Sequence, residues 1–352
     1  MEPISDTAYL ITMDNCLTQY FRCPEGYVRF APIESLSTES RFFCLGEGVV
    51  CYGRYCDAVP ASSPAESLHD AYADTTITEG SVLLPFDLTE IVDNLRHELY
   101  VDSAGARKST LESPINRLYY LVRPMLPVAV RKHLQRIRLK GWHKIPFPHW
   151  PVDRTVDNLF ERLLQLSLKA QNRDRIPFIW YWPNGARSCA IMTHDVETSA
   201  GRDFCGTLMD IDDRFGIKAA FQVVPEQRYE VTPEYLDSIT NRGFEVGVQD
   251  LNHDGRLYRN QQQFITRAAK INAYGRQWGA EGFRAGVLYR RQEWFDALDF
   301  SYEMSVPNVA HLDAQRGGCC TVFPYFVGKL LEIPVTTTQD YSLFHILRQH
   351  SI

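Results

Sequence analysis

Several features that would define a protein class at once are missing from this 352-residue sequence. No apolar run approaches the ~20 residues that a membrane-spanning helix needs. The first residues lack the positive stretch and long apolar run of a signal peptide. No Cys-x-x-Cys pair occurs among the nine cysteines, so neither a structural zinc site nor a disulfide framework is indicated. We therefore expect a cytoplasmic protein with reduced thiols.

An excess of basic residues is also missing. The 37 Lys and Arg residues are outnumbered by 43 Asp and Glu residues, which gives a net charge of -6. This balance argues against a nucleic-acid-binding protein. Residues 128–144 are a local exception, because they are basic and contain no Asp or Glu. They are typical of a helix that touches an anionic membrane surface, or of a connecting helix whose arginines pair with the acidic remainder of the chain.

The length and the order of patterns predict three regions. Residues 1–110 resemble a small α+β domain, with a hairpin across residues 41–52 and a helix capped by Asp87. Residues 111–183 are predicted to form a basic helical and aromatic linker. Residues 184–352 alternate between strand and helix patterns, which predicts parallel strands in an α/β sheet or barrel.

The chemistry is expected to centre on residues 188–198. The apolar run Cys189–Met192 predicts a buried strand, and polar residues follow it directly. In extended backbone Asp195 and Glu197 point to the same side, so they could serve as general base and metal ligand. The alternative is a helix N-terminus, capped by Thr193 or Asp195.

Other polar residues follow further predicted strands: Gln249 and His253, then Arg284, then His311. The carboxyl ends of parallel strands meet at one end of a barrel. We therefore expect these residues to converge on the two carboxylates. A histidine beside carboxylates indicates a metal site, and an arginine would hold one carboxylate ionised and oriented.

Four segments resemble, in order, the motifs of NodB-type polysaccharide deacetylases. They are Thr-His-Asp-Val-Glu (193–197), Glu-Val-Gly-Val-Gln-Asp-Leu-Asn-His-Asp-Gly (245–255), Gly-Phe-Arg-Ala-Gly (282–286) and Leu-Glu-Ile-Pro (331–334). The resemblance covers roughly residues 184–352. It implies an incomplete (β/α) barrel that binds one divalent metal, usually zinc. It also implies hydrolysis of an N- or O-acetyl group on a carbohydrate substrate.

The resemblance also implies roles for single residues. Asp195 matches the general base, and Arg284 matches the arginine that orients it. Glu197 takes the place of a metal-binding aspartate, and His253 matches a metal-binding histidine. Gln249 stands where the family usually has a second histidine, and an amide oxygen suits zinc poorly.

The general acid is the least defined part of the predicted site. Family members generally continue to a further strand that carries a histidine acid, and His311 and His345 are the candidates to replace it here. Three functions stay open: a carbohydrate deacetylase, a weakened relative that binds a glycan or a partner protein, and a hydrolase of small cyclic amides. The sequence specifies neither the sugar nor the oligomeric state.

Overall fold

The computed structural model describes residues 15–24, 26–32, 35–57, 61–103, 122 and 125–349. The chain divides into two compact units, and each unit draws on three stretches of sequence. Unit 1 contains residues 1–109, 140–189 and 317–322, and unit 2 contains residues 110–139, 190–316 and 323–352. The expected linker, residues 111–183, is shared between the units. Except for residue 122, its part before residue 125 lies outside the described residues.

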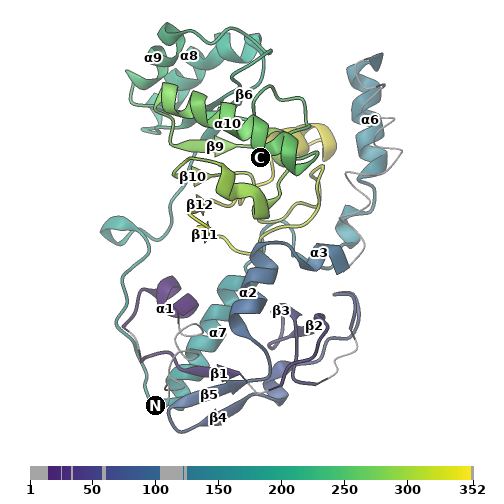
Figure 1. Cartoon of the computed structure of the whole chain (residues 1–352), viewed down its shortest axis with the longest axis vertical. Helices are drawn as coiled ribbons and strands as arrows, with labels where there is room; N and C mark the ends of the chain where they lie inside the picture. Colours follow the sequence, from purple (N-terminus) through teal and green to yellow (C-terminus); the bar gives the residue numbers. More distant parts are fainter. Residues whose placement is uncertain are drawn as a thin grey trace, which may run out of the picture. The chain divides into compact units, whose positions relative to one another are not determined.

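Short strands form two small sheets in the described part of unit 1 (Figure 1). One sheet has the order β1-β5-β4, with strands Phe30–Pro32, Ser81–Leu84 and Thr76–Thr78. The other is the predicted hairpin, in which β2 (Arg41–Cys44) pairs antiparallel with β3 (Val50–Gly53). Two apolar runs on either side of the turn glycines Gly46 and Gly48 are therefore enough to predict this hairpin.

The helices of unit 1 pack on these sheets. They are α1 (Asn15–Phe21), α2 (Leu88–Arg96), α3 (Tyr100–Ser103) and α7 (Thr155–Ala170), with 3₁₀ turns at Ala71–Ala73, Trp142–Lys144 and Pro183–Gly185. The predicted cap of α2 is confirmed, because the Asp87 carboxylate accepts a hydrogen bond from the Glu90 N–H at 3.0 Å. The aromatic strand expected at residues 176–183 is wrong, since these residues form no strand.

One short piece of unit 1 comes from far along the sequence. We call residues 317–322 the inserted segment. The Tyr100 hydroxyl donates to the Gly318 carbonyl at 2.7 Å. The buried Asp157 carboxylate accepts from the Thr321 hydroxyl at 2.8 Å. Buried hydrogen bonds to α3 and α7 therefore hold the inserted segment in unit 1.

A seven-stranded sheet forms the centre of unit 2. Its order is β11-β12-β10-β9-β8-β7-β6, and all neighbours are parallel except β11 and β12. The strands are β6 (Thr193–Val196), β7 (Ala220–Val223), β8 (Glu245–Gln249), β9 (Gly282–Arg284), β10 (Tyr302–Glu303), β11 (Tyr325–Val327) and β12 (Leu330–Glu332). The predicted parallel α/β sheet is confirmed. In the described residues β6 and β11 are its open edges, so barrel closure stays a prediction.

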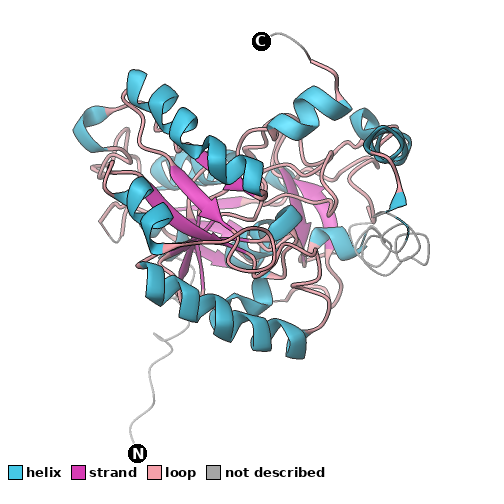
Figure 2. Ribbon diagram, turned by 90° about the horizontal axis from the view of Figure 1, so that it is seen from above, coloured by secondary structure: helices cyan, strands magenta, loops and turns pink. Residues whose placement is uncertain are grey.

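Helices alternate with the strands of unit 2 along the sequence, and Figure 2 colours the helices and strands of the whole chain. They are α6 (Val128–Arg138), α8 (Ser199–Arg214), α9 (Pro233–Thr240) and α10 (Gln261–Trp278). Short helical turns lie at Gly286–Leu288, Gln292–Ala297 and Ser342–Ile346. The predicted Thr232 cap and the predicted span of α10 are both confirmed.

The two faces of the unit 2 sheet differ in chemistry. One face packs on the helices through the apolar residues Val196, Phe221, Val223 and Val246, and it also carries His194 and Glu303. Because side chains alternate along a strand, the residues between these point to the other face. That face, which we call the site face, carries the polar residues: Asp195, Gln222, Glu245, Gln249, Arg284 and Tyr302.

The predicted strand at Cys189–Met192 is wrong. The first strand is Thr193–Val196, and the apolar run before it is exposed, with Ile191 at 56% and Met192 at 43%. The reason is that β6 is an edge strand, so hydrophobicity alone does not decide where pairing begins. The predicted helix start at Thr193 or Asp195 is also wrong, since α8 begins at Ser199 with Thr198 as its cap.

Helix α6 contains most of the basic stretch 128–144. Its apolar residues Val130, Leu134 and Ile137 are exposed. Among the helices of the described ranges, none combines the length and apolarity needed to cross a membrane. Contact of α6 with a membrane surface stays a prediction.

Candidate functional site

The candidate site lies on the site face, at the carboxyl ends of β6, β8 and β9. The strand register pairs Asp195 with Gln222 and pairs Gln249 with Arg284. Neighbouring parallel strands thus bring residues that are nearly 90 positions apart in sequence onto one surface. This is the end of a parallel sheet where active sites are usually found.

An arginine and a carboxylate form the first part of the site. Arg284 donates from Nη1 to Asp195 Oδ1 at 2.8 Å and from Nε to the Met304 carbonyl at 3.1 Å. Arg284 is only 8% exposed. Because the bond to Met304 fixes the guanidinium to the sheet, Arg284 orients the Asp195 carboxylate.

A second pair lies beside the first. Glu197 Oε1 lies 2.9 Å from His253 Nε2, and Gln249 Nε2 approaches the same oxygen at 3.5 Å. Burial alone would raise the pKa of Glu197, but His253, Arg228 and Gln249 together outweigh burial and lower that pKa. Burial alone would lower the pKa of His253, but Glu197 and Asp250 together outweigh burial and raise that pKa. Each group therefore favours the charged form of the other.

The loop after β8 holds His253 in an unusual backbone conformation. Asp250 and His253 have φ values of +53° and +52°, a region that side chains other than glycine rarely adopt. A Cβ on Gly286 would lie 2.7 Å from Asp250 Oδ2 and 3.2 Å from His253 Cδ2. Gly286 therefore allows both side chains to approach the backbone closely. Such strain is characteristic of functional loops.

Glu197, His253 and Gln249 can be tested as a metal site. The side chain of Gln249 is buried at 1% exposure, and its Oε1 has no hydrogen-bond partner among the described residues. In the assigned orientation of the amide, this oxygen lies beside the Glu197 carboxylate and the His253 imidazole and could act as a metal ligand. In the described ranges no group of three or more His, Cys, Asp or Glu residues could hold a metal. Glu197 and His253 supply two strong donors and Gln249 a weak one, so metal binding at these residues stays a prediction.

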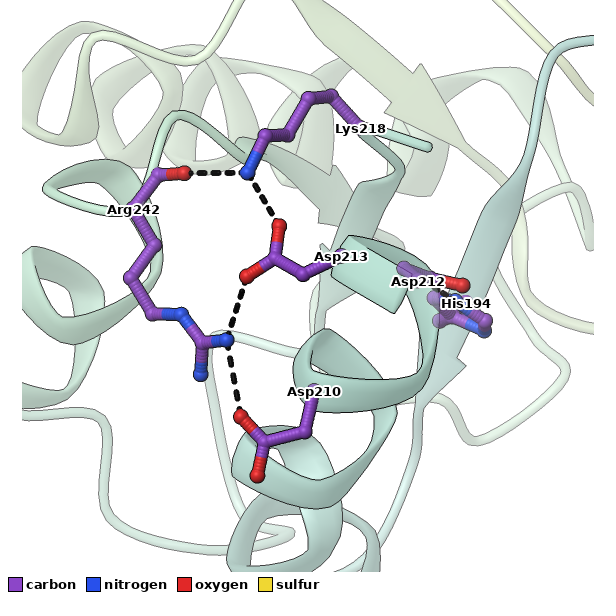
Figure 3. Close-up of polar contacts among 6 residues, drawn as sticks. All are labelled: His194, Asp210, Asp212, Asp213, Lys218 and Arg242. Carbon is purple, nitrogen blue, oxygen red and sulfur yellow. Dashed lines mark hydrogen bonds and ion pairs between the residues drawn. The ribbon is translucent and has the colours of Figure 1, made fainter. Parts of the chain in front are cut away.

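His194 lies in the same strand but does not belong to this site. Its side chain is on the helix side of β6, where Nε2 lies 2.8 Å from Asp212 Oδ2 of α8 (Figure 3). Arg242 holds Asp210 and Asp213 in a separate ion-pair cluster near the end of the same helix. Because side chains alternate along β6, His194 points to the helix side and the adjacent Asp195 points to the site face.

The two candidates for the general acid lie in different surroundings. His311 is buried in the segment that follows β10. His345 Nδ1 lies 3.0 Å from Lys132 Nζ of α6. Their roles stay predictions.

Two residues of the site region carry no signal in the sequence. Arg228 Nε donates to the Glu197 carbonyl at 2.9 Å. Gln222 is fully buried beside Asp195. The alternation of β7 places Gln222 on the site face, but only the register shows that it adjoins Asp195.

Comparison with known proteins gives limited information. No family model matches the sequence, and no curated protein matches it. A candidate polysaccharide deacetylase from Mycobacterium smegmatis is similar over 44% of this chain and 61% of its own, at 20% identity and a TM-score of 0.34. The family 4 acetyl xylan esterase from Clostridium thermocellum, in complex with a cobalt ion, is similar over 45% of this chain and 79% of its own, at 16% identity and a TM-score of 0.29.

A third structure is similar in the same way. The Xyl-CE4 domain of a multidomain xylanase, from the hindgut metagenome of Trinervitermes trinervoides, is matched over 33% of this chain and 56% of its own, at 16% identity and a TM-score of 0.28. The chain thus spans less than two thirds of two of these three structures. Likeness at this level assigns no activity to this chain.

Proposed function

We propose that unit 2 is a metal-assisted hydrolase that removes acetyl groups from a carbohydrate. The observation that carries this proposal is the position of two charged pairs, Asp195 with Arg284 and Glu197 with His253, at adjacent strand ends on one face. One pair supplies an oriented base, and the other supplies two donors for a cation. The order of the sequence motifs supports the same reaction.

The side chains divide the work. Asp195 would take a proton from the attacking water, and Arg284 would orient Asp195 for that purpose. Glu197, His253 and Gln249 would hold the metal. A divalent metal bound there would polarise the acyl carbonyl and activate water. His311 is our candidate to donate a proton to the leaving group.

A second candidate function is binding of a glycan without catalysis. Gln249 favours it, because this position supplies an amide where zinc sites normally have an imidazole or a thiolate. With two strong donors, metal affinity would be low. In either case we propose a cytoplasmic location, so a glycan substrate would be a precursor on that side of the membrane.

Acetate release tests the first function. The full chain is incubated with zinc or cobalt and with acetylated xylan or N-acetylglucosamine oligomers. We expect acetate from an acetylated carbohydrate, and loss of this activity in Asp195→Asn. Asp210→Asn is the matched control, because Asp210 is an exposed carboxylate in a surface ion pair. No acetate from any carbohydrate with either metal would refute the hydrolase and leave the binding function.

A further inference from the structure

A buried glutamine lies on the site face behind Asp195. Gln222 is the β7 neighbour of Asp195 and is 0% exposed. Neither its Oε1 nor its Nε2 has a hydrogen-bond partner among the described residues. A buried amide without partners is strongly unfavourable, and buried polar groups are almost always bonded to protein or to ordered water. The Gln222 amide therefore indicates a bound hydrogen-bonding molecule.

Two glycines make room for polar side chains at this level of the sheet. A Cβ on Gly247 would lie 2.3 Å from Gln222 Oε1 and 2.6 Å from Nε2, so the amide lies directly over Gly247. A Cβ on Gly282 would lie 2.3 Å from Cζ of Tyr302, so the phenol ring lies over Gly282. Gly247 and Gly282 are neighbours on β8 and β9, because the next residues, Val248 and Phe283, are paired.

Gln222 and Tyr302 therefore lean toward each other from opposite sides. Neighbouring strands are about 4.8 Å apart. An amide over one glycine and a phenol over the next are thus separated by roughly the distance that one water molecule can bridge. The Tyr302 hydroxyl in turn donates to the Glu245 carboxylate.

The Glu245 end of this row of polar groups borders a cavity. Glu245 lines a cavity of about 270 Å³ together with Trp278 and Glu281. The gap in the row lies between Gln222 and Tyr302, where the unpartnered amide atoms are.

We propose that Gln222 binds an internal water molecule that bridges its amide to the Tyr302 hydroxyl, which in turn donates to Glu245. The water is the ligand of this site, and it rests on the burial of Gln222 and on the two glycines that make room for the amide and the phenol.

A crystal structure of the full chain, at a resolution that shows waters, tests the site. We expect a water within about 3.2 Å of both the Gln222 amide and Tyr302 Oη. In Gln222→Leu this water should be absent while the backbone of β7 and β8 is unchanged. A wild-type structure in which the amide contacts only carbon atoms would overturn the proposal.

The melting temperature is an independent measurement. If water satisfies the amide, Gln222→Leu removes real hydrogen bonds and should lower Tm. If the amide has no partner, the same substitution removes an unfavourable buried polar group and should raise Tm, which would contradict the proposal. Gln262→Leu, on the exposed side of α10, controls for the general effect of this exchange.

Tyr302→Phe tests the bridge, because it keeps the ring and removes the hydroxyl. We expect the water to remain at the Gln222 amide with one contact fewer, and Tm to fall. A Tm equal to that of the wild type would overturn the bridge to Tyr302. If the chain releases no acetate at all, the proposed function fails, and the water and the sign of the Tm change still decide whether the site exists.

Discussion

Replacing Gln249 with histidine should turn a weak cation site into a strong one. The Gln249 amide nitrogen lies 3.5 Å from Glu197 Oε1, and His253 Nε2 lies 2.9 Å from the same atom. An imidazole at this position would place a nitrogen near the other two donors, because its reach from the backbone is close to that of the glutamine amide. Three strong donors and an open position are what a catalytic zinc site normally has.

The size of the effect follows from the kind of donor that is gained. Changes to residues that only orient metal ligands alter metal affinity by roughly 10–100-fold. Exchanging a weak amide oxygen for an imidazole changes a ligand itself. We therefore expect Gln249→His to bind zinc about 100-fold more tightly, which corresponds to about 3 kcal/mol. Burial of Gln249 supports this, since little solvent competes at the site.

The assay is a titration of zinc into metal-free protein by calorimetry. Gln262→His, on the surface of α10, is the matched control for a histidine that binds zinc without the site. Equal affinities for wild type and Gln249→His would mean that Gln249 does not face the metal. Tight binding by the wild type would mean that another residue, such as Asp250 or Asp254, has replaced the missing histidine. Either result would refute the reasoning about the weak amide donor.

Three further predictions concern stability. Arg284→Met should destabilise unit 2 by roughly 1–3 kcal/mol in chemical denaturation, because it breaks bonds to Asp195 and Met304. The surface control Arg242→Met should cost about 0–1 kcal/mol. Equal losses of stability in the two variants would contradict the role of Arg284. Burial raises the pKa of Glu303 above its ordinary value of 4.5, so the folded state keeps a proton that the unfolded state releases, and stability falls as pH rises above that value. Glu303→Gln should therefore raise Tm more at pH 8 than at pH 5, and a gain independent of pH would rule this out. Gly247→Ala should lower the free energy of unfolding by about 1–3 kcal/mol, because its Cβ would meet Gln222. Gly206→Ala, where the new Cβ on α8 meets no atom, should raise it by up to about 1 kcal/mol. Similar melting temperatures for both variants would show that Gln222 moves away freely.

Local signals predicted the elements whose ends are fixed by their own residues. Helix α10 was expected at residues 261–278 and lies there, where Asn260 caps its start and Gly279 adopts a left-handed conformation at its end. Asp87 and Thr232 cap their helices for the same reason. Such signals act over three or four residues, so a single sequence contains them in full.

Contacts between strands were harder to predict. The approach of Glu197 and His253 was expected because both follow parallel strands, and the structure places them 2.9 Å apart. Gln222 was missed, because a glutamine inside an apolar strand gives no sign of its register partner. Cys189–Met192 was misassigned, since pairing with β7, rather than hydrophobicity, determines where β6 begins. The register of a sheet is a property of several segments together, and no one segment specifies it.

The inserted segment has a consequence for how the protein is made. Its residues 317–322 complete unit 1, yet the ribosome adds them only after residues 190–316 of unit 2. At roughly 5–20 residues per second, this stretch takes on the order of 10 s to synthesise. During that time the Asp157 carboxylate and the Tyr100 hydroxyl are without the partners that they have in the finished fold. The first unit to be synthesised is thus completed only after most of the second has emerged, so the two units of a nascent chain cannot mature one after the other.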